Sequence, residues 1–180
     1  MHLRSMFVLG LVLLAGCTAP QPDEPSAPAS TDVSVTLSNE HTATYTVAVH
    51  AIPPDADGIE LIFENGSTHL FDGPVEDLSR ESLQNVTSLS VDGSQHSEEV
   101  TLAPNRGVGL TLASVPPGSA VVYFVRSPAG LRATLGPGVA QCAPDSTGAD
   151  LSVTIVADGS LDSRLSCTDA ATQPESVASF

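Results

Sequence analysis

The chain has 180 residues, of which 21 are acidic and six are arginine, with no lysine, and its formal net charge is −15. Such a surface repels nucleic acid phosphates and anionic lipid headgroups, which excludes nucleic acid as a partner. The length beyond residue 32 is enough for one domain that buries about two-thirds of its unfolded surface.

Residues 1–16 have the pattern of an export signal. Arg4 precedes an apolar run, SMFVLGLVLLA, that extends from Ser5 to Ala15. As a helix this run would be about 16 Å long, too short to cross a hydrocarbon core of about 30 Å. A short apolar core behind a basic residue is typical of a signal peptide.

The end of this run, Leu14-Ala15-Gly16-Cys17, resembles the lipobox of secreted lipoproteins. The resemblance implies cleavage before Cys17, attachment of a diacyl or diether lipid to its thiol, and a position on the extracellular face of the cell membrane. Two lipid chains give stable attachment. The alternative is an ordinary secreted protein with an incidental cysteine.

The segment after the cysteine is rich in proline and has no bulky apolar residue. Because it cannot form a core, we expect residues 17–32 to be the lipidated cysteine and a disordered tether. The folded domain is then expected at 33–168, with a C-terminal tail at 169–180.

The three cysteines are an odd number for an exported chain. If lipid occupies Cys17, then Cys142 and Cys167 can form a disulfide that closes a loop of about 26 residues and contributes roughly 3.5 kcal/mol. Two free thiols or a metal pair are the alternatives.

The absence of lysine, the many aspartates and a pI near 4.3 are similar to the proteins of haloarchaea. At molar salt the Debye length falls to about 3 Å and the self-repulsion of such a surface is screened. Only 15% of the residues are charged, below the usual quarter. An acidic secreted protein from a high-GC bacterium is the alternative.

Apolar residues alternate with polar ones along most of the chain, which predicts half-buried strands. Residues 33–37 and 43–51 are expected to form a hairpin joined by the link NEHT. Further hairpins are expected at 59–71, 87–102 and 151–167. Their turns are Asn65-Gly66, predicted as type I′, Asp92-Gly93 and Asp158-Gly159.

The continuously apolar run Ala120–Val125 predicts a central strand with both faces buried. One short helix or an irregular loop is expected within residues 75–84. Eight to ten short strands separated by turns predict an all-β fold, an antiparallel β-sandwich that is broadly immunoglobulin-like. The chain lacks the tryptophan and the cysteine spacing of antibody domains.

Candidate binding sites are few. Asp55, Asp57 and Glu60 surround a glycine-containing turn and are a weak calcium candidate, because alternating oxygen ligands suit that ion. A solvated acidic turn is the other interpretation. The histidines have no short ligand spacing, and no other metal is expected.

Two segments, Asn65-Gly66-Ser67 and Asn85-Val86-Thr87, fit the acceptor pattern for N-glycosylation. Asn65 falls on an expected hairpin tip, where Asn-Gly would also be favoured by turn geometry alone.

No nucleophile elbow, P-loop or dinucleotide fingerprint occurs in the sequence. We therefore expect a lipid-anchored, non-enzymatic binding or structural module that contacts an envelope protein through its loops and needs no cofactor. The alternatives are a sugar- or ester-active hydrolase and a small solute-binding accessory lipoprotein.

Overall fold

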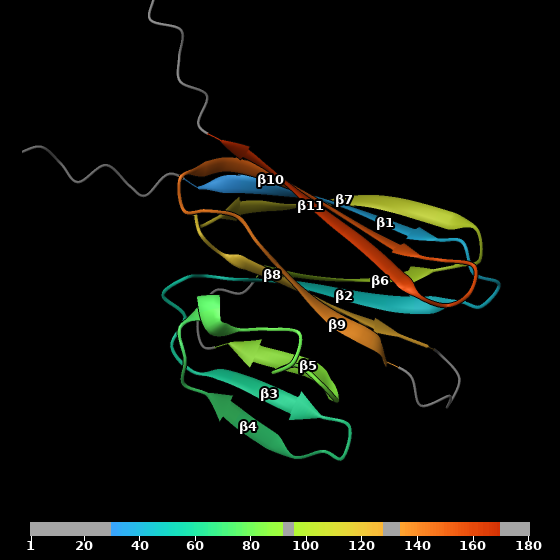
Figure 1. Ribbon diagram of the computed structural model, residues 1–180, viewed down its shortest axis with the longest axis horizontal. Coiled ribbons are helices and arrows are strands. Elements are labelled where there is room, and N and C mark those ends of the chain that lie inside the picture. The colour runs from blue at the N-terminus through green and yellow to red at the C-terminus, as the bar shows by residue number, and fades with distance from the viewer. Residues whose placement is uncertain (1–29, 92–95, 128–133, 170–180) are drawn as a thin grey trace, which may run out of the picture.

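The computed structural model describes residues 30–91, 96–127 and 134–169 (Figure 1). These residues form eleven strands and one short 3₁₀ helix, with no α-helix, so the all-β prediction is confirmed although the strand count exceeds eight to ten. The elements are β1 (Thr31–Asn39), β2 (Tyr45–Ile52), β3 (Ile59–Phe63), β4 (Thr68–Phe71), η1 (Val75–Asp77), β5 (Val86–Val91), β6 (His96–Leu102), β7 (Arg106–Val115), β8 (Ala120–Arg126), β9 (Thr134–Gln141), β10 (Ser146–Ile155) and β11 (Leu161–Asp169).

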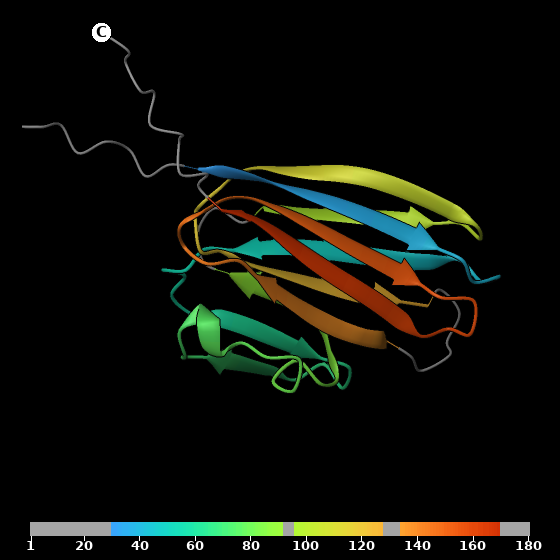
Figure 2. The ribbon, with the colours of Figure 1, turned by 45° about the horizontal axis from the view of Figure 1, so that its top comes forward.

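The strands form three sheets. Sheet A has the order β11-β10-β1-β7, sheet B has the order β6-β2-β8-β9, and sheet C has the order β4-β3-β5. Sheets A and B form the sandwich, and sheet C lies beside the other face of sheet B (Figures 1 and 2). The paired strands are antiparallel, as predicted, except that β1 and β10 run parallel.

The first core lies between sheets A and B. Its residues come from alternate positions of long strands, such as Val33, Val35 and Leu37 of β1 and Val47 and Val49 of β2. Side chains at alternate positions of a strand lie on one face, which is why the alternation in the sequence marked these residues.

The second core lies between sheets B and C. Ile52, Val122 and Phe124 of sheet B pack with Ile59 and Leu61 of sheet C and with further apolar residues. Sheet B is therefore covered on both faces. Strand β8 is buried from its first residue to Val125 and lies between β2 and β9, as its continuous apolar run predicts.

Two expected hairpins are wrong. Strand β1 pairs with β7 and β10 in sheet A, whereas β2 pairs with β6 and β8 in sheet B, so the link 40–44 crosses between sheets. Likewise β5 pairs with β3, and β6 pairs with β2. Alternation of apolar and polar residues shows that each of two strands buries one face. It does not show whether the two strands are paired within one sheet or face one another across the core from different sheets. Residues 92–95, which include Asp92-Gly93, lie outside the described residues.

The hairpins β3–β4 and β10–β11 are present. Their turns share one geometry, in which Phe63 N donates to Ser67 O at 2.9 Å and Val156 N donates to Ser160 O at 2.9 Å. In the first of them, φ is positive at Gly66 (78°) but not at Asn65, so the predicted type I′ turn is wrong. A three-residue loop that ends in a left-handed glycine accounts for both turns.

The segment 75–84, for which a helix or an irregular loop was expected, is a 3₁₀ turn at Val75–Asp77 followed by further turns. Val75, Leu78 and Leu83 are nevertheless buried in the second core. These residues are three and five positions apart because the backbone between them is irregular, and it places all three side chains against the sheets.

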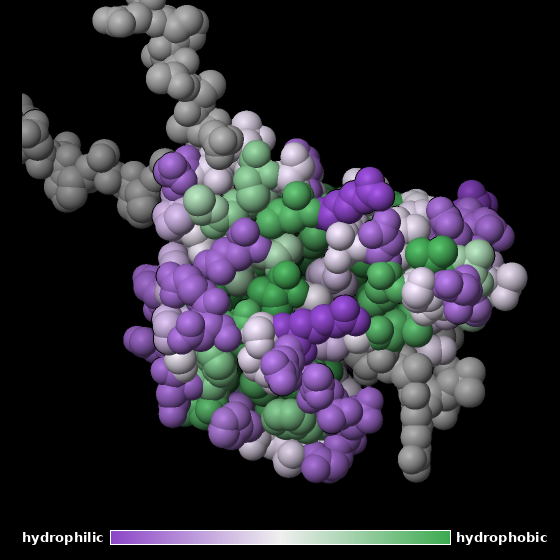
Figure 3. Space-filling view, viewed as in Figure 1, coloured by the Kyte–Doolittle hydropathy of each residue, from purple (hydrophilic) through white to green (hydrophobic). Residues whose placement is uncertain are grey.

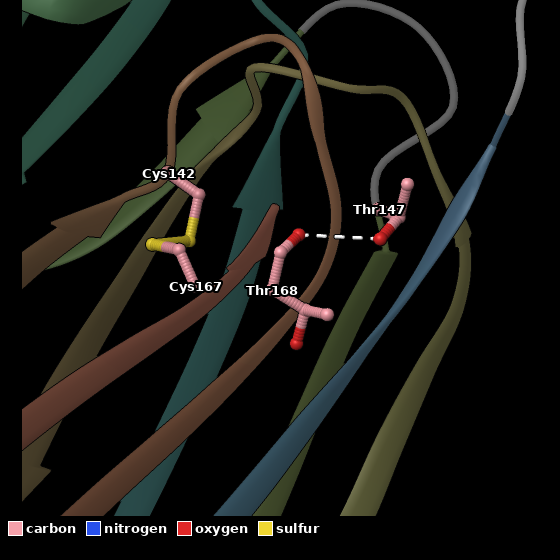
Figure 4. The surroundings of a disulfide bond; sticks show 4 residues. All are labelled: Cys142, Thr147, Cys167 and Thr168. Carbon is pink, nitrogen blue, oxygen red and sulfur yellow. Dashed lines mark hydrogen bonds between the residues drawn. A yellow bond between two sulfur atoms is a disulfide. The ribbon is translucent and has the colours of Figure 1, made fainter. Parts of the chain in front are cut away.

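A disulfide joins Cys142, which follows β9, to Cys167 in β11 (Figure 4). The Cα atoms are 5.7 Å apart, and the Thr147 hydroxyl donates to Thr168 O close by. Because β9 belongs to sheet B and β11 to sheet A, the disulfide links the two sheets along one side of the sandwich.

None of the described segments forms a helix with the length and apolar character of a membrane span. Hydrophilic side chains are spread over the face drawn in Figure 3, and the hydrophobic areas between them are divided into small pieces.

Candidate functional site at the loop end

The described fold begins and ends at the same end of the sandwich. Strand β1 starts at Thr31 beside the start of β10, and β11 ends at Asp169 opposite Ser146 (Figures 1 and 2). The opposite end carries the connections 40–44, 103–105 and 156–160, which we call the loop end. An attachment at the N-terminus would leave the loop end as the part of the domain farthest from it.

Asn39 connects these loops to one another. Its side chain is almost fully buried, and Nδ2 donates to the carbonyl oxygens of Ala43 at 2.8 Å, Ala103 at 3.1 Å and Leu102 at 3.2 Å. Oδ1 accepts from His41 N at 3.0 Å. One side-chain amide therefore joins loop 40–44, which connects sheet A to sheet B, and loop 103–105, which connects sheet B to sheet A. A buried amide whose donors and acceptor all have hydrogen-bond partners gives a defined local structure.

His41 lies within the loop that Asn39 holds. Its Nδ1 accepts a hydrogen bond from Ala43 N at 3.0 Å, and the Tyr45 hydroxyl lies 3.2 Å from the same atom. A backbone N–H can only donate, so Nδ1 is the acceptor and the neutral ring carries its proton on Nε2. The ring also packs edge-on against Tyr45, with centroids 5.6 Å apart.

The third loop adds a carboxylate. Asp158 Oδ1 accepts from Ser160 N at 2.8 Å and from the Ser160 hydroxyl at 2.6 Å. These hydrogen bonds, chiefly that of the hydroxyl, lower the pKa of Asp158. Glu40 N donates to Ile155 O at 2.8 Å, which fastens loop 40–44 to the end of β10.

Across residues 30–91, 96–127 and 134–169, no group of three or more His, Cys, Asp or Glu side chains could hold a metal ion. A small, partly open recess of about 20 Å³ lies at the opposite end, beside Thr31, Ser119 and Cys142. It has room for about one water molecule and none for a substrate.

The structure separates the residues singled out from the sequence. Asp55 and Asp57 lie exposed in the turn before β3, whereas Glu60 is exposed on β3, and the three form no metal-holding group. Cys17 lies outside the described residues. Asn65 and Asn85 are both exposed at one end of sheet C, where Glu64 N donates to Asn85 O at 2.9 Å.

The role of Asn39 was not predicted from the sequence, although the alternation of residues along β1 contains a signal for it. Val33, Val35 and Leu37 mark the buried face of β1, and position 39 continues this alternation with a polar residue. A polar side chain on a core face needs hydrogen-bond partners, which identifies it as a structural connection.

A family model described as "Halobacterial Ig domain protein" matches residues 1–173. The chain belongs to this family. A halobacterial Ig domain agrees with the β-sandwich seen here and with the haloarchaeal character of the composition. No curated protein matches the sequence.

Among solved structures, the halobacterial Ig domain is similar to the T6SS lipoprotein TssJ1 from Pseudomonas aeruginosa. The identity is 11% and the TM-score 0.45, over 77% of this chain and 98% of that chain. A structure described as "Trapped Toxin" matches with 8% identity and a TM-score of 0.32, over 76% and 24% of the two chains. Neither likeness assigns a function, because the TM-scores are low.

Proposed function

We propose that the protein is a lipid-anchored, non-enzymatic module on the extracellular face of the cell membrane that binds an envelope protein through its loop end. The observation that carries the proposal is the separation of the two ends. The first described strand begins at Thr31, at the end opposite the loops that Asn39 connects.

The anchor in this proposal is the lipid on Cys17. Thirteen residues lie between Cys17 and Thr31, and fully extended they span at most about 45 Å. Strand β10 has ten residues, so the loop end is a further 30 Å or so from the attachment point. A domain held in this way extends its loops toward other components of the envelope.

Membership in a halobacterial Ig domain family supports a binding module. The loop end supports it further, because the hydrogen bonds of Asn39 and of Glu40 N hold its backbone without a partner present. A preorganised surface loses less conformational entropy on binding than a mobile one. The acidic composition favours contacts in concentrated salt, where charge repulsion between proteins is screened.

The anchor is tested by Cys17→Ser. We expect the native chain in the membrane fraction and the variant in the medium. Retention of the variant in the membrane to the native extent would contradict the lipid anchor, while leaving the role of the loop end open to the next test.

The binding surface is tested by lysine placement, because the chain has no lysine of its own. Ala157→Lys adds an exposed amine at the loop end, and Ala143→Lys adds a matched amine in the exposed turn at the other end. An amine-reactive cross-linker applied to intact cells in molar salt should couple a protein partner to Ala157→Lys. Equal coupling through Ala143→Lys, or coupling through neither, would contradict the proposal. The native chain gives the background from its N-terminus.

A further inference from the structure

We propose that Asn65, and not Asn85, carries an N-linked oligosaccharide. Both asparagines fit the acceptor pattern, and both are exposed. The structure distinguishes them by the hydrogen bonds of the third residue of each pattern, Ser67 or Thr87, and by the backbone that presents the amide.

At Asn65 the acceptor segment is a complete local unit. The Ser67 hydroxyl donates to Asn65 Oδ1 at 2.7 Å, and Ser67 N donates to the same oxygen at 2.9 Å. Both bonds draw electron density toward Oδ1, which makes the Nδ2 protons easier to remove. Within the described residues Nδ2 itself makes no hydrogen bond, and Gly66 has no side chain to cover it.

At Asn85 the corresponding hydroxyl is used elsewhere. The Thr87 hydroxyl donates to Ile62 O at 3.1 Å, across the β3–β5 pair, and Thr87 is half-buried. The backbone of Asn85 is in the left-handed region, with φ of 61°, and its carbonyl accepts from Glu64 N. To bring Thr87 to the Asn85 amide, the start of β5 would have to leave sheet C.

The surroundings of the two amides differ in the same direction. Asn65 lies at the tip of the β3–β4 hairpin, which points toward the loop end of the molecule (Figure 1). Asn85 lines a surface depression together with Arg80, Gln84 and Pro137. Glu64 of the hairpin also lines this depression, whereas Asn65 at the tip does not. A transferase can therefore approach Asn65 without entering the depression.

The reaction is a glycosyl transfer from an oligosaccharide linked to a polyisoprenoid phosphate, catalysed by a membrane transferase. Asn65 Nδ2 attacks C1 of the first sugar, and the N–C1 bond forms. The bond between C1 and the phosphate oxygen breaks, and the phosphate leaves with the electron pair. One Nδ2 proton passes to a base of the transferase. This step rests on the export included in the proposed function but not on the lipid anchor.

The test is glycopeptide mass spectrometry of the full chain from a haloarchaeal host. Cleavage after arginine gives peptide 81–106, which carries Asn85, and a separate sample cleaved after glutamate gives peptide 65–76, which carries Asn65 and is free of Cys17. We expect hexose-containing mass on the Asn65 peptide and the unmodified mass on peptide 81–106. Asn65→Gln and Ser67→Ala should abolish the added mass, whereas Ser67→Thr should retain it.

Asn85→Gln and Thr87→Ala are the matched controls and should leave the added mass unchanged. Formation of the Cys142–Cys167 disulfide reports folding of every variant. An exported chain with bare Asn65, or with sugar on peptide 81–106, would overturn this proposal and leave the anchored module intact. A chain that stays in the cytoplasm would overturn both proposals. A Cys17→Ser chain that is secreted with sugar on Asn65 would support both, and a Cys17→Ser chain that stays in the membrane with sugar on Asn65 would support this one alone.

Discussion

The two cores are held in different ways. The first core, between sheets A and B, is fastened along one side by the Cys142–Cys167 disulfide and at the loop end by the hydrogen bonds of Asn39. The second core, between sheets B and C, contains neither feature and is formed by short strands and the irregular segment 75–84. The first core is therefore held by covalent and hydrogen-bonded connections, and it positions the loop end. Sheet C is held against sheet B mainly by apolar packing.

The largest expected effect is that of Phe124→Ala in the second core. Phe124 is fully buried, and its truncation should cost about 3–5 kcal/mol in the free energy of unfolding. Because sheet C depends on packing, its amides in β3 and β5 should lose protection from hydrogen exchange more than those of β1 and β10. Leu70→Ala, which removes an exposed side chain of sheet C, should change the unfolding free energy by less than about 0.5 kcal/mol. Equal loss of protection in sheets A and C would remove the contrast between the cores.

The double variant Cys142→Ser, Cys167→Ser acts on the first core. Opening the covalent loop should lower the unfolding free energy by about 3.5 kcal/mol through the greater entropy of the unfolded chain. Guanidinium titration in molar salt measures it, with the reduced native chain as the control. Relative to the native chain, the double variant should lose more exchange protection in β9 and β11 than in β3 and β5, and a larger loss in β3 and β5 would contradict a stabilising role of the disulfide in the first core.

Asn39→Ala removes the connection between the loops. The peptide groups it pairs, including the carbonyl oxygens of Ala43 and Ala103, would lose their partner, at a cost of about 1–3 kcal/mol. Asn39→Asp keeps the acceptor for His41 N but loses both donors, so it should loosen the loops to a comparable extent. Exchange at residues 40–44 should rise while the second core is unchanged. Cross-linking through Ala157→Lys should fall in the same variants, and undiminished cross-linking would show that partner binding does not need the connected loops.

The smallest effect concerns pH. His50 lies on the face of β2 toward the second core, with its ring edge-on to Phe124. Burial lowers its pKa below 6.5, the positive charge of Arg126 adds to this, and Glu99, which is ion-paired with Arg126, opposes it.

The unfolded chain therefore binds this proton more readily than the folded one, so His50 should lower stability as pH falls below about 6.5. His50→Gln should reduce the loss of unfolding free energy between pH 7.5 and 5.5, whereas the exposed His69→Gln should not. An unchanged pH slope in His50→Gln would contradict the direction of this shift.

Much of the fold was predictable from local pattern. Val33, Val35 and Leu37 could be assigned to a buried face, and Ala120–Val125 to a central strand, because burial leaves its periodicity in the sequence. The partner of each strand could not, since β1 and β2 contribute to one core from opposite sheets. The third layer was also missed, because residues such as Ala48 and Ile52 do not by themselves show that the second face of sheet B is covered.

The candidate site was predictable only in part. The cysteines could be paired by counting, and the two acceptor asparagines by motif. The loop end needed the structure, because loops 40–44 and 103–105 meet only through the crossing of sheets and through one amide at position 39. The hydrogen bonds of Ser67 and Thr87 also depend on strand pairing, so Asn65 and Asn85 could not be distinguished as acceptors from the sequence.

The position of the loop end relative to the membrane can be measured by energy transfer. A donor dye on Ala157→Lys or on Ala143→Lys, with acceptor lipids in a vesicle that holds the lipidated chain, compares the two ends of one domain. The separation of about 30 Å along the strands should give clearly weaker transfer from Ala157→Lys. Equal transfer from both lysines, or stronger transfer from Ala157→Lys, would contradict a loop end that is held away from the membrane.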